Sequence, residues 1–274
     1  MTKRSNSPQR SLHTTRAQPP NLHISKLGIV SRDYGHEYEN GYRDFSKSLP
    51  GVLKLLDGQG CDAAIFSLFS VVPRRSFGLR GCFRNLRNIK AVLLEEFHDG
   101  KERCACRFVV WHKTNSVWQE YEFEQVFGTL TGMKENEIHD FVENEMPKRV
   151  MGNCCVLLCG ESNGVKYSPK DRKVHDPYGL ASAILKKNVE IVLNPIHDRM
   201  TRFEMRLKRR FLSRKNRWVV SVWNKGKTLK DGKVRDGKGP AWTVFRNGNK
   251  REVEVPLIPN KLEVEIGILD VRKG

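Results

Sequence analysis

No stretch of the 274-residue sequence is apolar for the roughly 18 consecutive residues that a membrane-spanning helix needs, so we expect no membrane contact. No charged segment leads into an apolar one near residue 1, and we therefore expect no secretory signal. The seven cysteines include no C-x2-C pair, which disfavours a zinc site, and we expect structural thiols with no metal and no cofactor. Their odd number and apolar surroundings suit a reducing compartment, which predicts a cytoplasmic location.

Acidic residues are scarce relative to basic ones, 31 against 49, and the formal net charge is +18. The excess is concentrated in residues 1–21, 199–217 and 225–251, while the rest of the chain is nearly neutral. Clustered basic charge attracts phosphate backbones, acidic proteins or anionic substrates, although a solvated surface is the equal alternative. No recognised nucleic-acid motif accompanies the charge. The candidate contacts to nucleic acid or an acidic partner protein are Arg202, Arg206, Arg209 and Arg210.

Residues 1–22 are polar, rich in arginine and serine, and we interpret them as a flexible basic extension before one domain of residues 23–274. In that domain, strand-like and helix-like patterns alternate, which predicts an α/β fold with mixed sheets in two layers. Strands are predicted at residues 23–30, 62–72, 89–97, 107–112, 117–123, 149–159, 189–193, 218–223, 242–246 and 263–269. Helices are predicted at residues 40–56, 135–145, 178–187 and 202–214, the last burying Phe203, Leu207 and Phe211.

The segment V-L-L-C-G-E at residues 156–161 carries the strongest chemical signal. It places Cys159 at the end of a buried strand and directly before Gly160. This arrangement is typical of a nucleophile elbow, in which a tight turn exposes the thiol and backbone N–H groups hold an oxyanion. The thiolate would need a base or a positive charge nearby. The alternative is a core cysteine without chemistry.

The wider sequence resembles the nitrilase superfamily of carbon–nitrogen hydrolases over most of residues 23–274. The family's early D-x-V-V-F-P-E strand corresponds to D-A-A-I-F-S-L at residues 62–68, and its I-C-Y-[DE] nucleophile strand to L-C-G-E at residues 158–161. A strand ending in Asn-Pro follows at residues 191–195, and a basic helix precedes a strand ending in asparagine at residue 224. The resemblance implies a four-layered αββα sandwich, hydrolysis of an amide- or nitrile-like bond, and assembly into a homo-oligomer.

The family's Glu–Lys–Cys triad is only partly present. The resemblance carries the nucleophile over to Cys159, but the position of the general base falls on Leu68 and no lysine occurs in residues 120–128. A leucine cannot accept a proton, so other residues would have to replace the base and the charge.

Several residues could act as substitutes. Glu161 adjoins the thiol, His197 follows the Asn-Pro strand, and Glu95 or Glu96 ends a neighbouring strand, of which we choose Glu96. A thiol–imidazole pair of Cys159 and His197 would resemble other cysteine enzymes, whereas a plain loop role is the alternative for the histidine. We expect Asn194 and Gly160 to contact the substrate.

Two hypotheses follow. The first is a divergent carbon–nitrogen hydrolase that acts on a small amide or nitrile through Cys159. The second is a catalytically degenerate relative that serves as a binding or assembly module, with basic surfaces that contact nucleic acid or an acidic protein.

Overall fold

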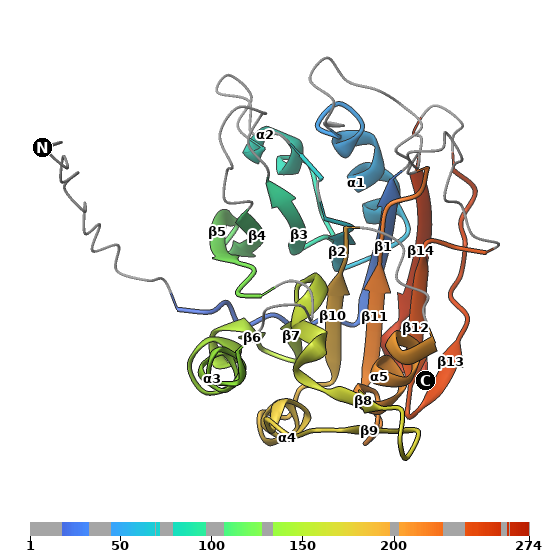
Figure 1. Ribbon diagram of the computed structural model, residues 1–274. Helices are drawn as coiled ribbons and strands as arrows, with labels where there is room; N and C mark the ends of the chain where they lie inside the picture. Colours follow the sequence, from blue (N-terminus) through green and yellow to red (C-terminus); the bar gives the residue numbers. More distant parts are fainter. Residues whose placement is uncertain are drawn as a thin grey trace, which may run out of the picture.

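The computed structural model describes residues 18–32, 45–68, 70–71, 79–96, 107–127, 134–197, 203–226, 239–258, 262 and 264–273. In this part of the chain two six-stranded sheets lie face to face, and helices cover their outer sides (Figure 1). Most of the predicted extension, together with Cys104, Cys106 and Arg202, lies outside the described residues.

The first sheet has the strand order β14-β1-β2-β3-β4-β5. Strands β1, β2 and β3 run parallel to one another, because a helical segment connects each of them to the next. Strands β14, β4 and β5 run antiparallel to their neighbours, and a short polar turn joins β4 to β5. The strands are β1 (Lys26–Arg32), β2 (Ala63–Phe66), β3 (Ala91–Glu96), β4 (Arg107–Thr114), β5 (Val117–Glu124) and β14 (Val264–Asp270).

The second sheet has the order β13-β12-β11-β10-β7-β6. Here β10 runs parallel to both β7 and β11, so the carboxyl ends of these three strands meet at one edge. The strands are β6 (Val150–Met151), β7 (Cys154–Val156), β10 (Ile191–Pro195), β11 (Trp218–Val222), β12 (Trp242–Arg246) and β13 (Asn249–Arg251), and a small separate hairpin consists of β8 (Lys166–Ser168) and β9 (Lys173–His175).

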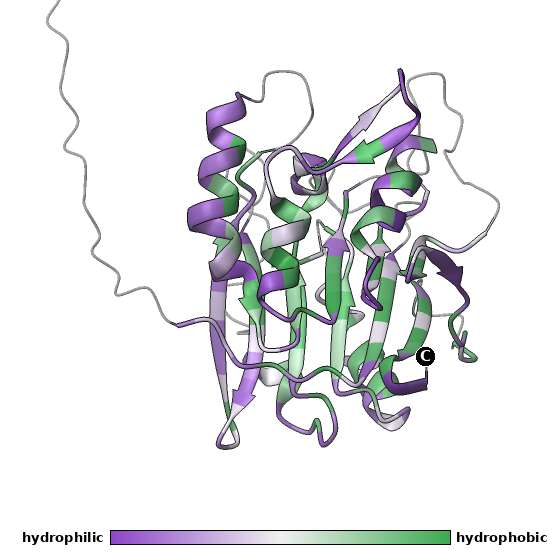
Figure 2. Cartoon of the chain, turned by 90° about the horizontal axis from the view of Figure 1, so that it is seen from below, coloured by the Kyte–Doolittle hydropathy of each residue, from purple (hydrophilic) through white to green (hydrophobic). Residues whose placement is uncertain are grey.

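Helices pack on the outside of both sheets. The first sheet is covered by α1 (Leu49–Gly58) and α2 (Arg80–Phe83), and the second by α3 (Glu135–Asp140), α4 (Leu180–Lys186) and α5 (Phe203–Leu212). Most helices present a hydrophobic side to the sheet and a hydrophilic side outward (Figure 2). Short helical turns are η1 (Phe141–Glu145), η2 (Met146–Arg149), η3 (Cys159–Gly164) and η5 (Val271–Lys273).

Three layers of apolar side chains hold this stack together. Alternate strand residues such as Leu27, Leu93 and Leu193 fill the space between the sheets. Their neighbours along each strand, such as Val92 and Val192, face the helices instead. The predicted four-layered αββα sandwich with mixed sheets is therefore confirmed.

Two predictions about single elements need correction. The strand expected over residues 149–159 is interrupted at Gly152, whose φ of 58° turns the chain between β6 and β7. Helix α5 is rotated relative to the prediction, because Phe203 is 61% exposed, while the buried side carries Met205, Lys208, Arg209 and Leu212. No helix in the described part of the chain is both long and apolar enough to cross a membrane.

Candidate active site

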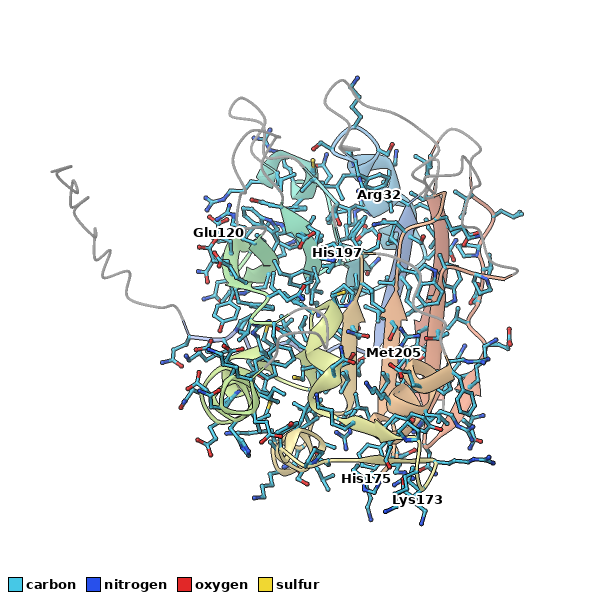
Figure 3. The ribbon with its side chains drawn as sticks, viewed as in Figure 1. Arg32, Glu120, Lys173, His175, His197 and Met205 are labelled. Carbon is cyan, nitrogen blue, oxygen red and sulfur yellow. The ribbon has the colours of Figure 1, made fainter. Side chains whose placement is uncertain are left out.

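The candidate site lies at the edge where the carboxyl ends of parallel strands from both sheets meet, a usual place for ligands in α/β folds. Cys159 follows β7, and His197 comes two residues after the end of β10 (Figure 3). The opposite sheet joins this edge directly, since the backbone N–H of Leu68, just beyond β2, donates to the carbonyl oxygen of Ile196 at 3.3 Å. The topology therefore brings residues that are far apart in sequence to one place.

Cys159 occupies a strained turn. Its φ is 30°, in a region that non-glycine residues rarely adopt, and the residue begins the short helical turn η3 while remaining only partly buried. Strained backbone at a reactive residue is a recurrent feature of nucleophile elbows. The abrupt change from strand to helical turn therefore fits the elbow that the sequence predicts.

His197 connects Cys159 to a carboxylate. Its ring is hydrogen-bonded to the Cys159 thiol, and its Nε2 lies 3.5 Å from the Oε2 of Glu95. Burial alone lowers the pKa of His197, but the hydrogen bonds and negative charges of Cys159 and Glu95 outweigh burial and raise it to about 9. The imidazole is therefore held in its protonated form at neutral pH, beside the sulfur atom.

The carboxylate in this arrangement is Glu95, and the structure replaces our choice of Glu96. Along β3, Ala91 and Leu93 face the other sheet, and Glu95 shares their side. Glu96 points the opposite way, where its Oε2 accepts a hydrogen bond from the Nε of Arg107 at 3.0 Å. The period of two along β3 separates the two glutamates, and it places Glu95 on the side that Ala91 and Leu93 turn toward the other sheet.

Glu161 is fully buried, but its carboxylate is occupied elsewhere. It pairs with Arg149 at 3.0 Å and accepts hydrogen bonds from the backbone N–H groups of Val126 and Leu158 at 2.9 and 2.8 Å. Burial raises the pKa of Glu161, and the guanidinium and these donors oppose that rise. The side chain closes the turn behind Cys159, which is a structural role.

Asn194 and Gly160, both predicted to contact the substrate, are used within the protein. The Nδ2 of Asn194 donates to the carbonyl oxygen of Leu157 at 2.6 Å, and its Oδ1 accepts from Ser221 at 3.1 Å. Asn194 thus fixes the end of β7, immediately before the nucleophile turn. Gly160 is buried inside η3.

The other described thiols differ sharply from Cys159. Cys61 and Cys155 are buried among apolar side chains, and burial raises the pKa of each to about 12. Burial also raises the pKa of Cys154. These thiols are protonated at neutral pH, as expected for structural cysteines. Only Cys82 among the others is partly exposed, and burial raises the pKa of its thiol too.

The basic residues of α5 divide into two groups. Arg206 and Arg210 are exposed and line a groove beside β12 and β13, together with Lys250. Arg209 has 0% exposure and cannot contact a partner on the surface. The sequence pattern did not separate these residues, because the helix is rotated relative to the predicted apolar stripe.

The sequence matches no protein-family model and no curated protein. Solved structures are similar in fold. An amidase from Nesterenkonia sp. superposes with a TM-score of 0.50 at 13% identity, over 92% of this chain and 93% of the amidase. This chain has the nitrilase fold. A cysteine-to-serine mutant of the Nesterenkonia AN1 amidase from the nitrilase superfamily also has a TM-score of 0.50, at 12% identity over 92% and 95% of the two chains.

A carbon–nitrogen hydrolase from Helicobacter pylori gives a TM-score of 0.45 at 11% identity, over 92% of this chain and 91% of that one. Leu68, the position that the motif resemblance assigns to the general base, is fully buried in the layer between the sheets. The titratable groups that interact with Cys159 are instead His197, which follows β10, and, through His197, Glu95 on β3.

Proposed function

We propose that this protein is a divergent carbon–nitrogen hydrolase, in which Cys159 attacks an amide- or nitrile-like bond with the help of His197 and Glu95. One observation carries the proposal: the imidazole is hydrogen-bonded to the thiol and lies 3.5 Å from a buried carboxylate, directly beside a cysteine with a φ of 30°. A nucleophile, a base and a group that orients the base are the usual parts of such a site.

The chemistry with an amide then needs only these residues. In the reactive state the thiol proton has passed to His197, which is an imidazolium beside the sulfur. The thiolate sulfur forms a bond to the carbonyl carbon while the π electrons move to oxygen. The tetrahedral intermediate expels the amine, which takes the proton from the imidazolium, and a thioester remains. A water molecule then gives a proton to the neutral His197 as it attacks the thioester, the C–S bond breaks with its electron pair returning to sulfur, and the carboxylic acid leaves.

Glu95 supports both protonation states of this cycle. Its carboxylate, only 3% exposed, orients the ring and stabilises the imidazolium that forms when the thiol is deprotonated. In this scheme His197 takes over the proton transfer that the nitrilase superfamily assigns to a glutamate. The loss of the acid at Leu68 is therefore compatible with hydrolysis.

An electrophilic probe tests this function. We expect a chloroacetamide or an aryl nitrile to label the parent protein at Cys159, as located by peptide mass spectrometry. Cys159→Ala should lose the labelling, whereas Cys82→Ala should retain it, because Cys82 is partly exposed but has no histidine partner among the described residues. Equal labelling of Cys159→Ala and the parent would refute the assignment.

The second candidate is a binding module without turnover. The exposed Arg206 and Arg210 line a groove of about 360 Å³ with Lys250, and a cationic groove fits an acidic protein or a nucleic-acid backbone. Binding of a single-stranded oligonucleotide should then weaken steeply with salt and decrease in Arg206→Gln/Arg210→Gln, but not in Lys186→Gln on α4. Binding that ignores salt would remove this candidate. The cytoplasmic location and the homo-oligomer stay predictions.

A further inference from the structure

Arg209 is a buried cation without a carboxylate partner among the described residues. It has 0% exposure, and its Nη1 donates to the Oγ1 of Thr243 at 3.1 Å. Its Nε and Nη2 are buried and donate to no group in the described part of the chain. A buried charge without a counter-ion is costly, so its presence calls for a negative group nearby.

Two other buried cations beside the second sheet have side-chain partners. Arg149, also buried, is paired with Glu161 at 3.0 Å. Lys208, the neighbour of Arg209 on the buried side of α5, donates to the Oδ1 of Asn163 at 2.8 Å. Met205, labelled in Figure 3, belongs to the same buried side of this helix. The rotation of α5 thus brings one unneutralised guanidinium into the protein.

The reactive group closest in kind to a partner for Arg209 is the sulfur of Cys159, because both residues lie against Trp223. The guanidinium carbon lies 5.7 Å from the ring of Trp223, and Cys159 packs against the small apolar cluster that contains the same ring. Burial lowers the pKa of Arg209 to about 10, and the negative charge of Cys159 opposes this change. Arg209 therefore remains charged at neutral pH, and its charge acts on the sulfur of Cys159.

We propose that Arg209 is a positioning residue of the Cys159 site, which supplies from α5 the positive charge that holds the sulfur in its reactive thiolate form. The inference rests on the proposed function, because it assumes that the thiolate is the working state. In this proposal Arg209 supplies the positive charge that the family takes from a lysine, which is absent from residues 120–128 of this chain. The charge acts through space, since the buried Nε and Nη2 are closed to solvent.

Charged groups reach this edge from several elements. Glu95 on β3 reaches it through His197, which follows β10, and Arg209 approaches from α5. Arg32, at the end of β1, donates to Asn224, whose Nδ2 donates to the carbonyl oxygen of His197 at 3.1 Å. Glu161 and Arg149 pair with one another behind the turn. Removal of the Arg209 guanidinium charge should leave the sulfur with less positive charge around it, and the thiolate should form only at higher pH.

The test is the pH dependence of Cys159 alkylation by iodoacetamide in the full chain, followed by mass spectrometry. In Arg209→Gln we expect the alkylation rate to rise at a higher pH than in the parent, and the rate at pH 7 to decrease about tenfold, in line with loss of a nearby charge. Arg209→Lys should keep the parent profile, because it keeps the charge. Arg214→Gln, an exposed arginine just beyond α5, is the matched control.

The outcomes separate the two proposals. A parent-like profile in folded Arg209→Gln would overturn the role of Arg209, and so would a shifted profile in Arg209→Lys, which would show that the shape of the guanidinium matters and its charge does not. If Arg209→Gln does not fold, a shifted profile in Arg209→Lys still overturns the role of the charge. If Cys159 of the parent reacts no faster than Cys82, the proposed function fails instead.

Discussion

Two buried arginines beside the second sheet differ in their partners. Arg149 and Glu161 form a closed cluster in which the carboxylate pairs with the guanidinium and accepts hydrogen bonds from two backbone N–H groups. Arg209 sits in an open cluster, where the group that balances it is a cysteine sulfur. The closed cluster stabilises the turn at Cys159, because Glu161 accepts a hydrogen bond from the backbone N–H of Leu158. In our proposal the positive charge of Arg209, in the open cluster, stabilises the thiolate of Cys159. A neutralised buried pair maintains structure, whereas an unneutralised cation maintains a reactive state.

The largest effect should come from replacing His197, whose ring is hydrogen-bonded to the sulfur of the open cluster. In His197→Gln we expect labelling of Cys159 by the amide-like probe to slow by about 10²–10⁴-fold, because the thiol loses its base. The free energy of unfolding in urea at pH 7 should fall by about 2–3 kcal/mol, the contribution of a pKa raised from 6.5 to about 9. His175→Gln, an exposed histidine paired with Asp171, serves as the control and should leave both quantities unchanged. If His197→Gln lost much stability but kept the labelling rate of the parent, His197 would have a structural role and not a reactive one.

Breaking the closed cluster should affect folding first. Glu161→Gln should lower the free energy of unfolding by about 3–5 kcal/mol, since Arg149 would keep a buried charge without its partner. Urea denaturation measures this, with exposed Glu143→Gln as the matched control. Labelling of Cys159 per folded molecule should stay within a few-fold of the parent. If it vanishes in a fully folded variant, Glu161 belongs to the reaction after all.

Adjacent glutamates on β3 sharpen the same contrast. Glu95→Gln should slow labelling of Cys159 by about 10²-fold, because the ring of His197 loses the carboxylate that orients it and stabilises its charge. Glu96→Gln should leave labelling unchanged and cost about 1 kcal/mol of stability through the weakened pair with Arg107, which is partly exposed. Equal labelling rates of Cys159 in the two variants would contradict the assignment of Glu95, and not Glu96, to the side of β3 that faces His197.

The smallest effect concerns pH and stability. The pKa of His197 is about 9 in the folded protein and 6.5 ordinarily, so folding favours its protonated form. Its contribution to stability is therefore fully present below pH 6.5 and is lost as the pH rises through about 9. The free energy of unfolding of the parent should decline over this window more than that of His197→Gln. Parallel pH curves for the two proteins would disprove the raised pKa.

Much of the fold was predictable because strands and helices leave periodic patterns. The hairpin of β4 and β5 and the parallel strands β10 and β11 lie where apolar alternation or apolar runs place them. The site was predictable only in part. Cys159 has a local signal, a strand end before glycine, but the choice between Glu95 and Glu96 requires knowledge of which side of β3 faces the second sheet.

The surface residues show the same limit. Phe203, Leu207 and Phe211 have the spacing of a buried stripe, yet the helix buries Met205, Lys208, Arg209 and Leu212 instead. Spacing fixes which residues share a side of a helix, and the partners packed against the helix decide which side turns inward. The structure therefore divides the basic residues of α5 into the exposed Arg206 and Arg210 and the buried Lys208 and Arg209.

By itself the sequence determined the α/β layering and the position of a cysteine at a strand end, because both depend on residues that are close together in the chain. The tertiary structure alone decided which groups act on that cysteine. Glu95, His197 and Arg209 come from β3, the loop after β10, and α5, and only the packing of two sheets and a helix brings their charges together. Electrostatic interactions depend on distance in space and on burial, and neither is encoded in local sequence order.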